Sequence, residues 1–304
     1  MTALTAPQFT NEAAAVAHLE ASRWPDEVSC PHCGSLNVHR MGGKTQAGMF
    51  LCNDCRDKFT GRTGTVMERS KIPVHKWLLA IHLMSSGKNG ASAHELHRGL
   101  GITYKSAWFL CHRIREAMNG NSGSPMGGAG GQVQADEMYV GNTSKRSKSY
   151  RKGLKRKAVA VALVDPGTGE ARAFHMELGA GANLVREILV KNASRKSTLV
   201  SDESKLYTKV GNEFNAHETV WHAANEYVNK MGFTTNNVEN FIGTFKRGMR
   251  GTYIHCSEQH LQRYLNEFSF RYSNRSGVGV GDVARAALAL KGIEGKRLTY
   301  RIPH

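Results

Sequence analysis

The stretch Thr234-Thr-Asn-Asn-Val-Glu-Asn-Phe-Ile-Gly-Thr-Phe-Lys-Arg-Gly248 organises the rest of the chain. If it is helical, its apolar residues fall at i, i+3, i+4, i+7 and i+11: Val238, Phe241, Ile242, Phe245 and Met249. This spacing predicts an amphipathic helix that packs on a core. Beside that stripe, Glu239 shares an edge of the helix with Lys246 and Arg250. A carboxylate followed by cations along one helix edge suits a metal site next to a phosphate backbone.

Two aspartates elsewhere in the chain are candidates to meet Glu239. Asp136 lies in the middle of a predicted strand at 132–140, where a charge is costly unless it is paired or binds a metal. Asp202 directly follows another predicted strand, at 198–201. The sequence therefore predicts an acidic site built from three distant segments.

The order of predicted elements around these residues defines the fold class. Three strands, a helix, a fourth strand, a helix, a fifth strand and a helix form the order of an RNase H-like α/β fold, with a mixed five-stranded sheet flanked by helices. In that fold the first and fourth strands are neighbours, so Asp136 and Asp202 should lie side by side. The strands are predicted at 132–140, 158–164, 171–178, 198–201 and 217–221, and the last helix at 257–271.

Four cysteines near the N-terminus form two Cys-x-x-Cys pairs, with eighteen residues between the pairs: Cys30, Cys33, Cys52 and Cys55. Two such pairs can complete a tetrahedral sulfur site, which predicts a zinc ribbon with one structural Zn²⁺. The alternative is two redox dithiols. A ribbon this small buries little core, so the metal is expected to hold it together.

Composition favours a polyanionic partner. The 304 residues include 41 Lys plus Arg and 25 Asp plus Glu, a formal net charge of +16. Basic charge spread over an enzyme-sized chain is typical of nucleic-acid binding. We see no apolar run long enough to span a bilayer and no signal peptide, and the cysteine pairs indicate a reducing compartment.

A helical module is predicted between the ribbon and the acidic domain. Two helices, the turn at 99–102 and a third helix capped by Thr103 resemble a helix-turn-helix. Lys105, His112 and Arg115 lie on one flank of the third helix and are candidate DNA contacts. The predicted domains are the N-terminal helix and ribbon at 1–66, this module at 67–122, a Gly-rich linker at 123–131, the catalytic domain at 132–275 and a basic C-terminal tail at 276–304.

Across roughly residues 25–275 the chain resembles DDE-class insertion-sequence transposases, in particular the insertion-sequence family numbered fifteen-ninety-five, which pairs a zinc ribbon with an RNase H-like domain. The resemblance is carried by the cysteine pairs and by the segments 135–141, 201–204, 235–241, 246–253 and 263–272. It implies that Asp136, Asp202 and Glu239 are the catalytic metal ligands and that Lys246 is the basic residue beyond them. Ile242 replaces the large aromatic residue expected after Phe241.

The chemistry of the residues agrees with that assignment. Three carboxylates can hold two divalent ions, which activate an oxygen nucleophile and stabilise the leaving oxygen in phosphodiester cleavage. Mg²⁺ suits such oxygen ligands, and Mn²⁺ is possible. Lys246 would contact a phosphate as a point charge, and Arg247 and Arg250 on the same helix are further candidate DNA contacts.

The sequence leaves open which residue of each acidic pair is the ligand. Glu137 could replace Asp136, and Glu203 could replace Asp202, because strand alternation should let only one residue of each pair face the site. Ser201 and Ser204 are interpreted as caps or turn groups. The basic run at 145–157 could be a phosphate contact or a solvated loop.

The resulting functional prediction is a transposase that binds the terminal inverted repeats of an element, hydrolyses the phosphodiester at the ends and joins the 3′-hydroxyl to target DNA. Its partners would be double-stranded DNA and further copies of itself, as a homodimer or larger oligomer, in the bacterial cytoplasm at the nucleoid, with no membrane. The alternatives are a sequence-specific DNA-binding regulator with an inactive RNase H-like core and a resolvase-like nuclease.

Overall fold

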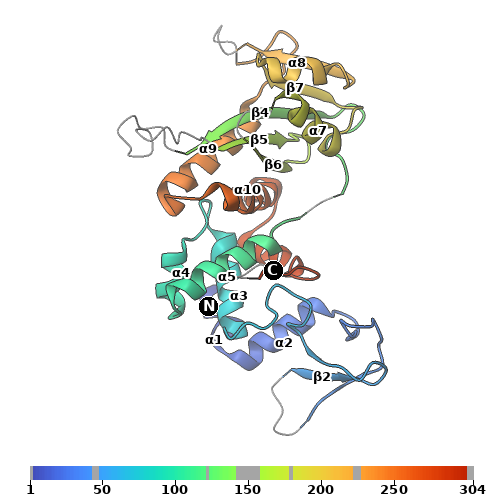
Figure 1. Ribbon diagram of the computed structural model, residues 1–304, viewed down its shortest axis with the longest axis vertical. Coiled ribbons are helices and arrows are strands. Elements are labelled where there is room, and N and C mark those ends of the chain that lie inside the picture. The colour runs from blue at the N-terminus through green and yellow to red at the C-terminus, as the bar shows by residue number, and fades with distance from the viewer. Residues whose placement is uncertain are drawn as a thin grey trace. The chain divides into compact units, whose positions relative to one another are not determined.

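The computed structural model describes residues 3–42, 48–120, 123–141, 158–177, 181–221 and 227–299 (Figure 1). The chain divides into two compact units. The first contains residues 1–120 and 280–304, and the second contains residues 121–279. The predicted basic run at 145–157 lies outside the described residues.

The first unit begins with a short 3-10 turn and two helices and continues into a three-stranded antiparallel sheet. These elements are Ala3–Thr5, α1 Pro7–Thr10, α2 Glu12–Arg23, β1 Val38–Arg40, β2 Met49–Cys52 and β3 Lys58–Thr60. Asn11 caps α2 by accepting a hydrogen bond from the backbone of Ala14. The sheet buries only a small core, in which Trp24 meets the stacked rings of Phe50 and Phe59 edge-on.

Three helices follow the ribbon: α3 Val74–Ser86, α4 Ala93–Leu100 and α5 Tyr104–Ala117. Ser92 and Glu95 form a reciprocal capping box that starts α4, and Gly101 ends that helix in the left-handed conformation with φ 59°. Thr103 caps α5 through the backbone N–H of Ser106, as the sequence predicts. Local capping chemistry therefore sets the turn between α4 and α5.

The C-terminal segment contains a helix. Residues Asp282–Lys291 form helix α11, which belongs to the first unit and packs against α3. The reason is burial: Ala289 and Leu290 are covered, and the buried Arg285 donates a hydrogen bond to the Ser85 carbonyl at 2.9 Å. The segment thus completes the helical part of the unit.

The second unit is built on a five-stranded mixed sheet with the order β6-β5-β4-β7-β8. Its strands are β4 Gln132–Val140, β5 Ala158–Val164, β6 Ala171–Met176, β7 Thr198–Asp202 and β8 Ala216–Val220. The β4–β5 and β5–β6 pairs are antiparallel, whereas β4–β7 and β7–β8 are parallel. The predicted adjacency of the first and fourth strands is confirmed, and the architecture is RNase H-like.

Helices cover both faces of this sheet (Figure 1). They are α7 Ala182–Asn192, α8 Lys205–Gly211, α9 Asn236–Gly248 and α10 Glu258–Ser273, with a π-helix at Met249–Tyr253 and a 3-10 turn at Ser276–Val278. Side chains from α7 and α8 pack on the face that holds Val133, Ala135 and Val161. Helices α9 and α10 pack on the opposite face, which holds Met138 and Ala160.

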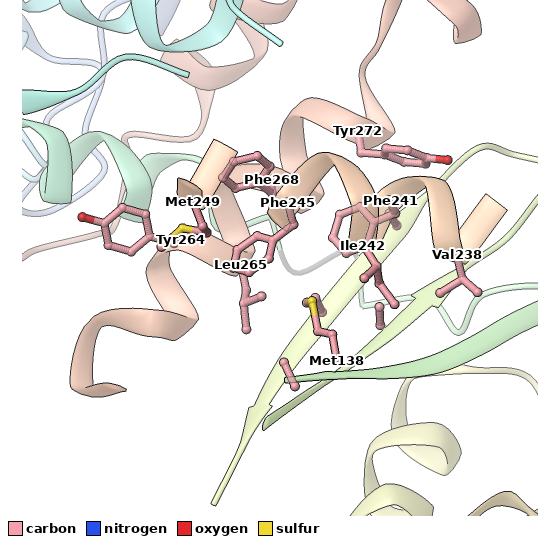
Figure 2. Packing of buried hydrophobic residues seen from close by; sticks show 14 of the residues in the cluster. Met138, Val238, Phe241, Ile242, Phe245, Met249, Tyr264, Leu265, Phe268 and Tyr272 are labelled. Atoms are coloured by element: carbon pink, nitrogen blue, oxygen red, sulfur yellow. The ribbon is translucent and has the colours of Figure 1, made fainter. Parts of the chain in front are cut away.

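The apolar stripe of α9 forms the centre of that second core (Figure 2). All five residues of the predicted stripe are buried, and Phe241 and Phe245 are fully covered. Phe245 meets Phe268 of α10 edge-to-face, with ring centroids 5.0 Å apart. Packing of this stripe holds the polar edge of α9, which carries Glu239, over strand β4.

Candidate metal centres

The four ribbon cysteines converge as predicted. Their sulfur atoms all lie within 4.8 Å of one another. The Cys30 and Cys55 sulfurs are 3.7 Å apart, and those of Cys33 and Cys52 are 3.6 Å apart. Zn–S bonds of about 2.3 Å in a tetrahedron place the sulfurs about 3.8 Å apart, so the cluster fits a zinc ion.

Backbone turns position these cysteines. The Cys30 N–H donates to the Ser35 carbonyl, and the Gly34 N–H donates back to the Cys30 carbonyl. The second pair is closed by a hydrogen bond from the Arg56 N–H to the Cys52 carbonyl, with Arg56 at φ 64°. The Cys55 backbone N–H, aided by that of Asp54, lowers the pKa of Cys52 to about 7. The turn thus favours the thiolate form of Cys52, whereas burial and the neighbouring sulfurs outweigh the backbone hydrogen bonds and raise the pKa values of Cys33 and Cys55.

A second cluster lies where the end of β7 meets the middle of β4 in the second unit. Carboxylate oxygens of Asp136, Glu137 and Asp202 all lie within 4.8 Å of one another. The parallel register pairs Gln134 with Val200, so two residues further along both strands Asp136 comes opposite Asp202. The predicted meeting of these two aspartates is therefore confirmed, and strand register is its cause.

Glu137 was expected to point away from a site that contains Asp136, and that expectation is wrong. The described β4–β7 pairing ends at Gln134 and Val200, before the acidic residues. Beyond that point β7 no longer separates the two faces of β4, so side chains from both faces can approach Asp202. The Glu137 carboxylate accepts a hydrogen bond from the Ser204 hydroxyl at 3.2 Å. Ser204 also donates its backbone N–H to the Asp202 carboxylate at 3.1 Å. The two adjacent acidic residues in β4 could have indicated that Glu137 also belongs to the site. Strand alternation argued against it, because alternation places neighbouring side chains on opposite faces.

Ser204 acts as a structural group, as the sequence suggested. Its hydroxyl accepts from the Leu206 N–H and so caps α8. Ser201 is buried, and its hydroxyl lies 2.9 Å from the His217 ring nitrogen. Both serines therefore support the end of β7 that carries Asp202.

The electrostatics of the cluster call for a cation. Burial, followed by the charges of Asp202 and Glu137, raises the pKa of Asp136 to about 7. Carboxylates held this close repel one another unless one is protonated or a cation sits between them. The ligand set is all oxygen, which suits Mg²⁺ or Mn²⁺. The cluster therefore fits a divalent cation.

The charge of Glu239 acts on this cluster, but Glu239 is not one of the three grouped carboxylates. Its charge contributes, less than those of Asp202 and Glu137, to the raised pKa of Asp136. Its carboxylate accepts a hydrogen bond from the Thr235 hydroxyl at 2.7 Å. The structure thus brings Asp136 and Asp202 together with Glu137, whereas Glu239 approaches from α9, on the face of β4 where Asp136 points.

The candidate DNA contacts fall into two groups. Lys105, Arg247 and Arg250 are exposed, and Lys246 is half-buried two turns beyond Glu239. His112 and Arg115 are only 1% and 2% exposed, which does not fit their prediction as DNA contacts. The helical period places all three α5 residues on one side of the helix. Packing against other residues covers the C-terminal part of that side, and periodicity gives no information about such packing.

Within the described part of the chain, no helix combines the length and the apolar content needed to cross a bilayer.

Comparison with known proteins identifies both metal-ligand regions. A family model described as the ISXO2-like transposase domain matches residues 128–273, which include Asp136, Glu137, Asp202 and Glu239. A second model, described as the transposase zinc-ribbon domain, matches residues 10–58 and so spans all four ribbon cysteines.

One similar protein and one solved structure complete the comparison. The protein is an uncharacterised one in transposable element ISH50 of Halobacterium salinarum, 26% identical over 277 residues, which cover 86% of this chain and 91% of that one. The structure is the simian T-cell lymphotropic virus intasome in complex with PP2A regulatory subunit B56 gamma. Its chain is 13% identical, with a TM-score of 0.29, over 58% of this chain and 63% of its own length, less than two thirds. A TM-score that low does not establish a shared fold. Because the ribbon and the transposase domain are both matched, in the order in which they occur here, the chain belongs to the IS1595 type of insertion-sequence transposases.

Proposed function

We propose that this transposase binds the inverted repeats at the ends of its element, cuts the phosphodiester there and transfers the freed 3′-hydroxyl into target DNA. The observation that carries the proposal is the group of three carboxylates within 4.8 Å of one another, where the end of β7 meets the middle of the neighbouring parallel strand β4 in an RNase H-like sheet.

The carboxylates of Asp136, Glu137 and Asp202 would hold divalent cations, and Glu239 would add a ligand from the α9 side. When bound, such cations stabilise charge developing on a phosphate and make water a better nucleophile. In the first step, water attacks phosphorus, the bond to the 3′-oxygen breaks, and that oxygen takes a proton to become a 3′-hydroxyl. In the second step, this hydroxyl loses its proton and attacks a target phosphodiester, so one P–O bond forms as another breaks.

Lys246 and the exposed arginines of α9 would hold the DNA next to the carboxylates. Lys246 lies two turns beyond Glu239 on the same helix and can neutralise a phosphate without leaving the site. Arg247 donates a hydrogen bond to the Thr244 hydroxyl at 3.1 Å, which orients its guanidinium along the helix. Each phosphate contact would add to the salt dependence of binding. Lys105 is the candidate contact on α5.

The zinc ribbon and the helices α3 to α5 would select the element ends. We propose that two or more copies assemble on paired ends, because both ends must be cut and joined. The protein would act on chromosomal DNA in the bacterial cytoplasm, at the nucleoid.

The test uses the full-length protein and a labelled duplex carrying the inverted repeat that flanks its gene. With Mg²⁺ or Mn²⁺, the wild type should nick at the repeat boundary and produce a joined product with a second, unlabelled duplex. A protein that binds the repeat without any metal-dependent cutting would be a regulator instead. Cutting of branched DNA without joined product would indicate a resolvase-like nuclease.

A further inference from the structure

Gln134 is a buried polar residue in β4, and its role does not follow from the chemistry above. It is 0% exposed and lies two residues before Asp136, on the same face of the strand. Its side-chain oxygen accepts two backbone hydrogen bonds, from Asn237 N–H at 3.0 Å and from Val238 N–H at 3.1 Å. Both donors are in the first turn of α9, so a strand residue is bonded to the start of the helix that carries Glu239.

The first turn of a helix has N–H groups without an intrahelical partner, and the N-cap side chain usually accepts from the second or third of them. In α9 the N-cap residue is Thr235, and it makes no side-chain cap. Asn237 and Val238 occupy the second and third helical positions. Gln134 therefore performs, from a neighbouring strand, the capping that Thr235 does not.

This arrangement lets the Thr235 hydroxyl serve another purpose. It donates to the Glu239 carboxylate at 2.7 Å instead of accepting from the helix backbone. The same end of α9 is also bonded from α10, because the Tyr272 hydroxyl donates to the Asn237 carbonyl at 3.1 Å. Figure 2 shows Val238 and Tyr272 at that end of the helix.

The amide group of Gln134 gives a further indication that its oxygen is needed. The side-chain nitrogen is buried and has no hydrogen-bond partner among the described residues. A buried donor without a partner is unfavourable, so an apolar side chain of similar shape would pack there at less cost if no acceptor were required.

We propose that Gln134 is a positioning residue: by capping α9 from β4, it fixes the distance between Asp136 and Glu239. The inference rests on the proposed function, because its kinetic test needs metal-dependent cleavage. Gln134 does not touch the reacting atoms and acts through the N-terminal turn of α9. Its effect should therefore appear in turnover and in the response to metal, not in affinity for DNA.

The matched variants are Gln134→Met, which keeps the length but removes the acceptor, and Gln134→Glu, which restores two acceptor oxygens and places a negative charge at a helix N-terminus. We expect Gln134→Met to lower kcat for end cleavage at least tenfold and to raise the Mn²⁺ concentration for half-maximal rate, with the Kd for the repeat unchanged. Gln134→Glu should recover most of the rate. The proposal is overturned if Gln134→Met cleaves like the wild type or if Gln134→Glu is as defective as Gln134→Met.

Hydrogen exchange of the wild-type protein provides a test that does not depend on a variant folding or on activity. The Asn237 and Val238 amides, bonded to the buried Gln134 side chain, should exchange at least tenfold more slowly than the Asn236 amide, which belongs to an exposed residue and is bonded only locally, to the Thr234 hydroxyl at 3.1 Å. Equal exchange at the three positions would overturn the cap. Slow exchange in a wild type that cuts no DNA would instead mean that the cap exists and the proposed function fails.

Discussion

The ribbon and the sheet domain each gather metal ligands from distant segments, but the two clusters relate differently to their surroundings. The ribbon has a core of four buried residues, and two of them, Cys30 and Cys52, belong to the sulfur cluster. The sheet domain has two large apolar cores that contain none of the acidic residues. The candidate metal cluster is thus part of the core in the ribbon, whereas in the sheet domain separate apolar cores hold the carboxylates together against their repulsion.

The largest effect should come from breaking the ribbon cluster. Cys52→Ser should abolish zinc binding and unfold residues 24–66, because structural zinc provides about 10–16 kcal/mol in small zinc domains. Zinc content and limited proteolysis measure this, and binding to the repeat should weaken. Cys256→Ser is the control, since this cysteine lies outside the cluster. Full zinc content in Cys52→Ser would show that the ribbon does not depend on this ligand.

Removing one carboxylate of the acidic cluster should greatly lower the cleavage rate but, unlike loss of a ribbon cysteine, should not destabilise the fold. Asp136→Asn should reduce cleavage by about 10³-fold or more, equivalent to about 4 kcal/mol, and leave repeat binding intact. Without metal its melting temperature should not fall, because the substitution relieves repulsion from Asp202 and Glu137. Mn²⁺ should raise the melting temperature of the wild type but not of the variant. Asp202→Asn should behave likewise, and loss of DNA binding together with cleavage would contradict the assignment.

A smaller effect separates the two glutamates. Glu137 groups with the aspartates, whereas Glu239 approaches on the α9 side. Glu137→Gln and Glu239→Gln should each lower the cleavage rate by about 10- to 100-fold and raise the Mn²⁺ requirement, in line with the usual loss on weakening a metal's ligand shell. The double variant should be as inactive as Asp136→Asn. Whichever single variant keeps the wild-type rate and metal response is not a ligand.

The smallest effect concerns the helical part of the first unit, which is stabilised by hydrogen bonds and not by the sulfur cluster. Glu12 of α2 accepts backbone hydrogen bonds from Val74 at 2.8 Å and His75 at 3.0 Å, and so caps α3 where Pro73 offers no side-chain cap. Burial would raise the pKa of Glu12, but these N–H groups and the His75 side chain outweigh it and lower the pKa.

A carboxyl with a lowered pKa in the folded state stabilises the protein above its unfolded pKa of about 4.5, and that contribution is lost as pH falls through the folded value. Glu12→Gln should therefore cost about 1 kcal/mol at pH 7, as loss of a cap usually does, and the difference from wild type should shrink as the pH falls below 4.5 and through the lowered pKa of Glu12. Thermal unfolding over that pH range, followed for the first unit, provides the measurement. A difference that stays constant with pH would show that the Glu12 charge is not involved.

Local features of the sequence were enough to predict most elements, the sulfur cluster and the meeting of Asp136 with Asp202. The stripe from Val238 to Met249 predicted the buried face of α9, because helical spacing alone determines which residues share a side. The Cys-x-x-Cys spacing predicted the sulfur cluster, because a short turn brings two sulfurs to one ion. The order of strands predicted that Asp136 and Asp202 would meet, since parallel neighbours end at one edge.

Tertiary structure alone decided the rest. Glu137 joins the aspartates because the β4–β7 pairing ends before the acidic residues, and alternation along a strand does not report where pairing stops. His112 and Arg115 are buried because packing covers one end of a side that periodicity treats as uniform. Gln134 caps α9 because the fold places residues 103 positions apart within hydrogen-bond distance. Periodicity reports what one segment can bury, whereas these three features depend on which other segment lies against it.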